Sequence, residues 1–246
     1  MQKMSKGLTL VELLVVIGIL VVLLGICFPL PDTMKTSGDF RVRLKGRKLF
    51  DEITVAGLSL PEADACALWP RTPANLGPDS TKITGRTFST STEYFQELFG
   101  LRNDGAGTRE PYLHDSAKVD VLYGCGVPPC KEGRLEPKNV MWCVAQGVTS
   151  DLDEVVPVLV TRNAQVEALL TAGSFDGTEK AEVGIGKENG GASDTPFGGK
   201  FFVVVRKGGA VDVVEARYSK LYQIYRHQRF AIDPAAQFGY LKTGAE

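Results

Sequence analysis

An apolar run near the N-terminus constrains the fold of this chain more than any other feature. It extends over residues 8–30 and contains only two polar side chains, Thr9 and Glu12. As a helix, these 23 residues would be about 35 Å long, which is enough to cross the hydrocarbon core of a bilayer. A helix in a soluble core usually keeps one polar face, and this run has none. We therefore expect a membrane-spanning helix over 8–30.

Two other uses of such a run fit the residues less well. A secretory signal peptide has an uninterrupted apolar segment and a small-residue cleavage site, whereas Glu12 interrupts this segment and no such site follows. A lipoprotein site before Cys27 would need a small residue where Ile26 stands. Glu12 still needs an explanation, because a charged side chain inside a bilayer costs roughly 2.5 kcal/mol or more and points to a function.

The residues around Glu12 supply that explanation. The stretch KGLTLVE follows a short basic leader and precedes about twenty apolar residues. It resembles the class III signal of bacterial type IV pilins and type II secretion pseudopilins. The resemblance implies that a prepilin peptidase cuts between Gly7 and Leu8 and methylates the new amine of Leu8, although Phe is commoner at this place in the family. Glu12 then becomes the fifth residue of the mature chain, which is the family's acidic position.

A filament of packed N-terminal helices gives a physical reason for an acidic residue at Glu12. The α-amine of an incoming subunit needs a counter-charge in that apolar core, and Glu12 of a neighbour can supply it. Glu12 would therefore select the register of assembly. Pro29 resembles the helix-breaking proline that many pilins carry, and its missing N–H would kink or end the helix there. Pro31 strengthens the expected break.

The chain divides into a leader (1–7), a transmembrane and assembly helix (8–30), a kink with an amphipathic half-helix (31–56) and a periplasmic head (57–246). We expect Asp39 to cap the half-helix. Small and apolar residues at spacings of four and three would form one apolar face of this half-helix. This face consists of Val42, Gly46, Leu49, Ile53 and Ala56.

Basic residues crowd the same half-helix. They are Lys35, Arg41, Arg43, Lys45, Arg47 and Lys48. The positive-inside rule alone would place this segment in the cytoplasm. A membrane anchor with a cytosolic C-terminal part is therefore an alternative topology, although the leader motif favours export. We expect these side chains to form a solvated face or to contact acidic heads of other subunits.

The head has the pattern of an α+β domain. A short helix is expected at STEYFQELFG (91–100), with a Ser or Thr cap and Gly100 as its stop. Strands are expected at 140–145, 155–162, 200–207 and 210–218. Gly208-Gly209 joins the last two as a hairpin, because paired glycines accept the positive φ of tight turns. We predict a pilin-like α+β fold, in which a long N-terminal apolar helix, kinked near Pro29, packs on an antiparallel sheet.

The cysteines of the head suit an oxidising compartment. Cys66, Cys125, Cys130 and Cys143 form an even set, which suggests two disulfides with three pairings open. We favour Cys125 with Cys130 and Cys66 with Cys143. A zinc site built from all four thiolates is the rival, although the sequence has no C-x-x-C pair.

One segment of the head, 171–200, is rich in glycine and acids. Its oxygen ligands are Asp176, Glu179, Glu188, Asn189 and Asp194. The family resemblance implies calcium as a candidate ligand, because major pseudopilins are known for a calcium-binding loop in the head. The D-x-D-x-D-G pattern is absent, so we expect a surface loop and no cofactor.

Catalysis and nucleic-acid binding find little support. His114, Asp115 and Ser116 are sequential neighbours whose side chains would diverge rather than form a triad, and no P-loop or G-x-S-x-G elbow occurs. A net charge of −1 gives no general case for nucleic acid.

These observations predict a structural subunit and not an enzyme. The resemblance implies a pseudopilin of a type II secretion-type filament, held in the inner membrane with its head in the periplasm. Its partners would be a prepilin peptidase, other pilin or pseudopilin subunits, the lipid bilayer and an inner-membrane platform with an ATPase. The alternatives are a minor type IV pilin for adhesion, motility or DNA uptake, and a membrane-anchored binding protein that never polymerises.

Overall fold

The fold was analysed on a computed structural model of the chain. It describes residues 10–27, 31–61, 64–101, 111–113, 119–131, 134–185 and 199–244. The chain falls into two units, Met1–Phe40 and Arg41–Glu246, and each is considered by itself. The second unit contains the whole head together with the larger part of the second helix.

Four α-helices lie in the described residues, and the predicted half-helix is the longest. They are α1 (Leu10–Cys27), α2 (Pro31–Leu58), α3 (Ser91–Leu98) and α4 (Leu221–Ile224). Short 3₁₀ turns connect the other elements at Pro73–Asn75, Ile83–Gly85, Val119–Leu122, Pro137–Asn139, Val166–Ala168, Ala216–Tyr218 and Pro234–Ala236.

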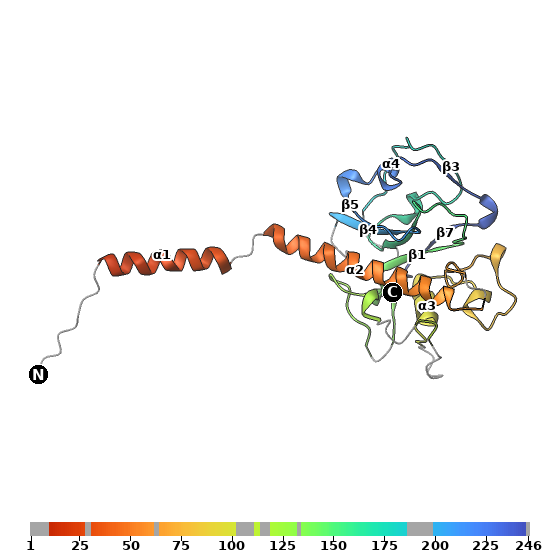
Figure 1. The fold of residues 1–246 in the computed structure, drawn as a ribbon, viewed down its shortest axis with the longest axis horizontal. Helices are drawn as coiled ribbons and strands as arrows, with labels where there is room; N and C mark the ends of the chain where they lie inside the picture. The colour runs from red at the N-terminus through yellow and green to blue at the C-terminus, as the bar shows by residue number, and fades with distance from the viewer. Residues whose placement is uncertain are drawn as a thin grey trace, which may run out of the picture. The chain divides into compact units, whose positions relative to one another are not determined.

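The head is built on a five-stranded antiparallel sheet in the order β5-β4-β2-β1-β7 (Figure 1). Its strands are β1 (Trp142–Gln146), β2 (Pro157–Thr161), β4 (Phe201–Arg206), β5 (Val211–Glu215) and β7 (Gly239–Leu241). A second, two-stranded sheet pairs β3 (Gly173–Phe175) with β6 (Phe230–Ile232). The predicted α+β class with an antiparallel sheet is confirmed.

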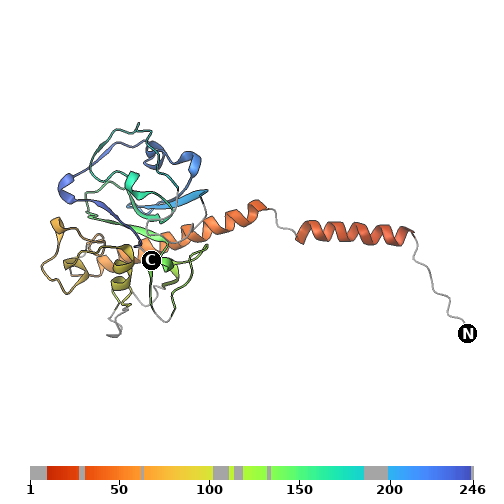
Figure 2. The ribbon, with the colours of Figure 1, turned by 180° about the vertical axis from the view of Figure 1, so that it is seen from behind.

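Two layers cover the large sheet. From Arg41 onwards α2 packs on one face, and the lobe containing α4, β3 and β6 covers the other, as Figure 1 and Figure 2 agree. The predicted apolar stripe of α2 is confirmed, because Val42, Leu49 and Ile53 are fully buried. One part of the hydrophobic core therefore lies between this stripe and the sheet, and another part lies between the sheet and the lobe.

The start of α2 differs from the prediction. Asp39 was expected to cap the helix, and this is wrong: α2 begins at Pro31 and Asp39 lies inside it. Proline suits the first turn of a helix, because the N–H that it lacks would have no intrahelical partner there. Pro31 thus opens α2, while Pro29 lies outside the described residues.

Within the head, the predictions that depend on neighbouring residues in the sequence are confirmed. Thr90 caps α3 by accepting a hydrogen bond from the Glu93 amide at 3.2 Å, and Gly100 follows with φ of 66°. The predicted β4–β5 hairpin is present, with Gly209 at φ of 77°. The four predicted strands correspond to β1, β2, β4 and β5, whereas β3, β6 and β7 were missed because three residues each carry too little pattern to predict.

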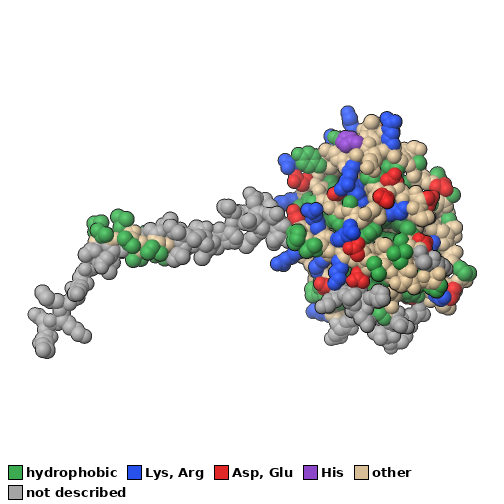
Figure 3. Space-filling view, in the orientation of Figure 1, with side chains coloured by type: hydrophobic (Ala, Val, Ile, Leu, Met, Phe, Trp, Pro, Cys, Tyr) green, Lys and Arg blue, Asp and Glu red, His purple; other side chains and the backbone are tan. Residues whose placement is uncertain are grey.

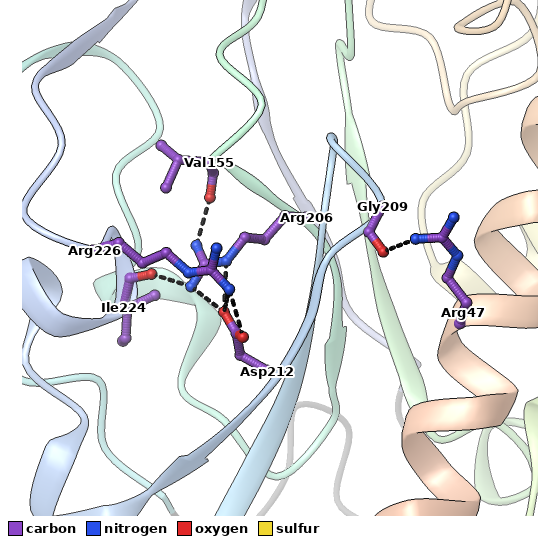
Figure 4. Close-up of polar contacts among 7 residues, drawn as sticks. All are labelled: Arg47, Val155, Arg206, Gly209, Asp212, Ile224 and Arg226. Atoms are coloured by element: carbon purple, nitrogen blue, oxygen red, sulfur yellow. Dashed lines mark hydrogen bonds and ion pairs between the residues drawn. The ribbon is translucent and has the colours of Figure 1, made fainter.

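A buried arginine ties the hairpin to the lobe above it. Arg206 on β4 is 2% exposed and donates through Nε to Asp212 Oδ2 on β5 at 2.7 Å. It also donates to the carbonyls of Val155, at 2.6 Å, and of Ile224. Arg226 donates to both oxygens of Asp212 at 2.7 and 2.8 Å (Figure 4). Each of the three nitrogens of the buried guanidinium thereby has an acceptor, and a buried charge needs such partners.

The ionisation of Asp212 couples this network to pH. Burial alone would raise the pKa of Asp212, but hydrogen bonds from Arg226 and Arg206 outweigh it and hold that pKa below its ordinary value. The folded state therefore favours the carboxylate. Its contribution to stability is complete above the ordinary aspartate pKa of about 3.9 and is lost as the pH falls through the lowered folded value.

We expect Asp212→Asn to lower the free energy of unfolding by about 2 kcal/mol at neutral pH, because the buried Arg206 loses its counter-charge. The difference from the wild type should begin to shrink below about pH 4 and should be lost as the pH falls through the lowered folded pKa of Asp212, where the wild-type carboxylate also becomes neutral. Urea unfolding of the full chain across this range measures both effects. Glu215→Gln, which breaks only the exposed pair with Arg217, is the control and should change little. A wild-type minus variant difference that is constant with pH would contradict this account.

Candidate assembly helix

The helix α1 exposes apolar side chains around its whole circumference. Nine of them are half exposed or more in the chain on its own: Leu10, Val11, Leu13, Leu14, Val15, Val16, Ile17, Ile19 and Leu20. The run from 13 to 17 alone covers more than one helical turn. Green side chains on the described part of α1 mark this surface in Figure 3. An all-round apolar helix of this kind needs lipid or other helices to cover it.

The predicted processing and membrane segment is described only in part. Gly7 and Leu8 lie outside the described residues, and Glu12 falls within α1 without a described side chain. The membrane-length helix predicted over 8–30 is not confirmed, because α1 covers Leu10–Cys27 and residues 28–30 are not described. In the described parts of the chain, no helix combines the length and the apolar character that crossing a membrane requires.

Close backbone approach fastens α2 to the sheet of the head. Gly46 is buried, and a Cβ atom at this position would lie 2.8 Å from both Trp142 Cη2 and Val205 Cγ2. The Trp142 indole is itself held, because its Nε1 donates to the Val121 carbonyl at 2.9 Å. Gly46 is therefore the place where only hydrogen fits between the helix and two strands.

Two basic residues flank that contact and complete the attachment. Lys45 donates to the carbonyls of Asp120 and of Tyr123, the latter at 2.8 Å, and its ammonium lies 5.4 Å from the centre of the Tyr123 ring. Arg47 donates to the carbonyl of Gly209 in the β4–β5 hairpin, as Figure 4 shows, and pairs with Asp51 at 2.9 Å. The sequence had suggested solvent or other subunits for these cations, whereas the head itself binds them.

The remaining predicted site residues are not brought into one site. In the described part of the head no disulfide joins the cysteines; Cys66 and Cys143 are buried, and Cys125 and Cys130 are half-buried. Burial raises the pKa of the Cys66 thiol, with Asp64 adding to the effect. The two predicted pairings thus stay predictions.

The calcium prediction also stays untested. Asp176 accepts hydrogen bonds from the amide and hydroxyl of Thr178 at 2.8 and 2.7 Å, and Glu188, Asn189 and Asp194 lie outside the described residues. Among the residues that are described, no three His, Cys, Asp or Glu side chains gather as metal ligands would.

Comparison with known proteins agrees with the N-terminal pattern. Residues 2–28 match the family model of the prokaryotic N-terminal methylation motif, consistent with the class III prepilin signal of type IV pilin-like proteins. The predicted resemblance is confirmed for this segment. The motif indicates a substrate of prepilin peptidase in the type IV pilin-like class. No curated protein and no solved structure matches the chain.

The contact at Gly46 predicts a steric effect of substitution. We expect Gly46→Leu to lower the free energy of unfolding of the head by about 1–3 kcal/mol, because the new side chain overpacks against Trp142 and Val205. Gly38→Leu is the matched control on the same helix, since a Cβ atom there meets nothing within 4 Å. Urea unfolding of both variants, in detergent, measures the difference. Equal stabilities would show that α2 does not depend on this contact.

Proposed function

We propose that this chain is a pseudopilin, a structural subunit of a type II secretion-type filament. The observation that carries the proposal is the N-terminal methylation motif followed directly by α1, whose apolar surface is uncovered on every side. Membrane lipid would cover that surface during storage and the α1 helices of other subunits would cover it after assembly. The subunit would be inserted in the inner membrane with its head in the periplasm, and a platform driven by an ATPase would extract it.

Processing would create the charge that assembly needs. Cleavage after Gly7 produces a new α-amine at Leu8, and methylation leaves it positively charged. Glu12 is four residues further along, about one helical turn away. Between neighbouring subunits, the amine of one and the Glu12 carboxylate of the next would pair inside the apolar filament core, where an unpaired charge is strongly unfavourable. The amine and the carboxylate would meet at only one axial offset between neighbouring helices, and this offset would set the register.

Two candidate functions share the N-terminal motif. The minor type IV pilin is the second candidate, because the methylation motif is common to both systems. The size of the head suits a specialised rather than a major subunit in either case, since a bulky head limits close helical packing.

The first test is intact-mass spectrometry of the full chain produced with and without a prepilin peptidase. With the peptidase we expect the loss of residues 1–7 and the gain of one methyl group on the amine of Leu8. A Gly7→Leu variant, which replaces the small residue at the cut, is the control and should remain uncut. An unchanged N-terminus in the presence of an active peptidase would refute the proposal.

The second test separates a filament subunit from a simple membrane anchor. Glu12→Gln should still be cleaved, but the yield of sheared filaments should fall by about a hundredfold or more, because a buried amine loses its partner. Glu12→Asp keeps the charge on a shorter side chain and should retain part of the yield. Normal function of Glu12→Gln in cells, without any defect in assembly, would favour the anchor that does not polymerise.

A further inference from the structure

The face of α2 that points away from the head has an unusual distribution of charge. Residues 40–50, FRVRLKGRKLF, contain five basic side chains and no acidic one. Acids flank this stretch, with Asp39 directly before it and Asp51 and Glu52 directly after it. Lys45 and Arg47 are engaged by the head, as described above, which leaves three of the five for another partner.

These three cations share one exposed surface with an apolar residue. Arg41, Arg43 and Lys48 are exposed, and within the described part of the chain no hydrogen bond or ion pair joins them to a carboxylate or a carbonyl. Leu44, which is 54% exposed, lies between them on the helix, with Arg43 on one side and Arg41 and Lys48 on the other. Basic side chains gather over this part of the head in Figure 3. We call these four residues the basic stripe.

The stripe lies opposite the buried face of the helix. At 100° per residue, Leu44 points about 140° away from the direction of Leu49, which is fully buried against the sheet. Val55 and Leu58, each 51% exposed, continue the apolar part of the stripe towards the end of α2. The head therefore covers one side of the helix and leaves a surface of cations around apolar side chains on the other.

We propose that the basic stripe binds the anionic phospholipid headgroups of the membrane that holds the N-terminal helix. The inference rests on the proposed membrane storage of the subunit. Cations that flank an apolar residue on a helix are suited to an interface, because the apolar side chain enters the headgroup region while the cations pair with phosphates. Arg41 follows residue 30, the end of the expected membrane segment, by about three helical turns, so the stripe is held near the membrane by its own chain.

The binding has a functional consequence. Each Lys or Arg near an anionic surface strengthens membrane association about fivefold, so the stripe would hold α2 and the head against the bilayer before assembly. Extraction into a filament would then have to release these contacts, and it would become easier as the content of anionic lipid falls. The same binding also accounts for basic residues on the side of the membrane that the positive-inside rule disfavours.

The test measures how fast Lys48 is acylated by a water-soluble amine reagent. The full chain is placed at one copy per nanodisc, either in phosphatidylcholine alone or in a mixture with phosphatidylglycerol, and the modified peptides are quantified by mass spectrometry. We expect Lys48 labelling to slow at least about fivefold in the anionic discs. Lys180 is the internal control, because it is exposed on the lobe that covers the other face of the sheet. High salt should restore labelling of Lys48, since the attraction is screened.

Variants that replace arginines with neutral residues show whether the basic stripe is responsible for the shielding of Lys48. Arg41→Gln with Arg43→Gln should weaken the lipid contact about 25-fold and restore labelling of Lys48 in anionic discs. The matched control is Arg217→Gln with Arg229→Gln, which removes two exposed arginines from the opposite lobe and should leave the shielding intact.

Three outcomes would overturn the proposal. Equal labelling of Lys48 in both lipids would show that the stripe does not bind anionic headgroups. Shielding that occurs only with several copies per disc would identify a second copy of the chain as the occupant. Shielding by duplex DNA in neutral discs, with none from anionic lipid, would identify a nucleic-acid surface. None of these outcomes depends on cleavage after Gly7, so failure here is distinguishable from failure of the proposed function.

Discussion

The head depends on the close approach of α2 to the sheet at Gly46. Because this residue lacks a side chain, the helix backbone reaches Trp142 and Val205 directly, and the buried stripe on either side of it can then fill the core. Lys45 and Arg47, next to it in the sequence, reach around the contact to backbone carbonyls of the head. Gly46 and the apolar side chains on either side of it together set which face of α2 is buried, and by elimination which face remains for membrane or other subunits.

A second constraint acts on the far side of the sheet. Arg206 carries a buried charge whose hydrogen bonds reach the β5 strand, the segment before β2 and the end of α4. The lobe is therefore held to the sheet by these polar contacts as well as by its apolar side chains, and α2 is held to the other face by apolar packing together with the hydrogen bonds of Lys45 and Arg47.

The sequence predicted those parts of the fold that local patterns encode. Spacings of four and three residues located the buried stripe of α2, alternation and β-branched residues located four strands, and Gly208-Gly209 located their hairpin. It placed the start of α2 wrongly. Aspartate is common at helix N-caps, which made Asp39 a candidate, but α2 already begins at Pro31, and proline suits the first turn of a helix. It missed β3, β6 and β7, because each has only three residues and becomes a strand only by pairing with another one. The role of Lys45 and Arg47 was also missed, since their acceptors are carbonyls distant in the sequence.

The amino-acid sequence by itself determined the N-terminal signal, because the methylation motif and the apolar run that follows it are local patterns that do not depend on the head. The sequence also determined that a basic segment follows this run. Only the tertiary structure decided which of those cations are available to a partner. Lys45 and Arg47 donate hydrogen bonds to carbonyls of the head. Arg41, Arg43 and Lys48 remain exposed. The reason is physical: linear patterns specify what a segment can bind, whereas packing specifies which of its faces remains free to do so.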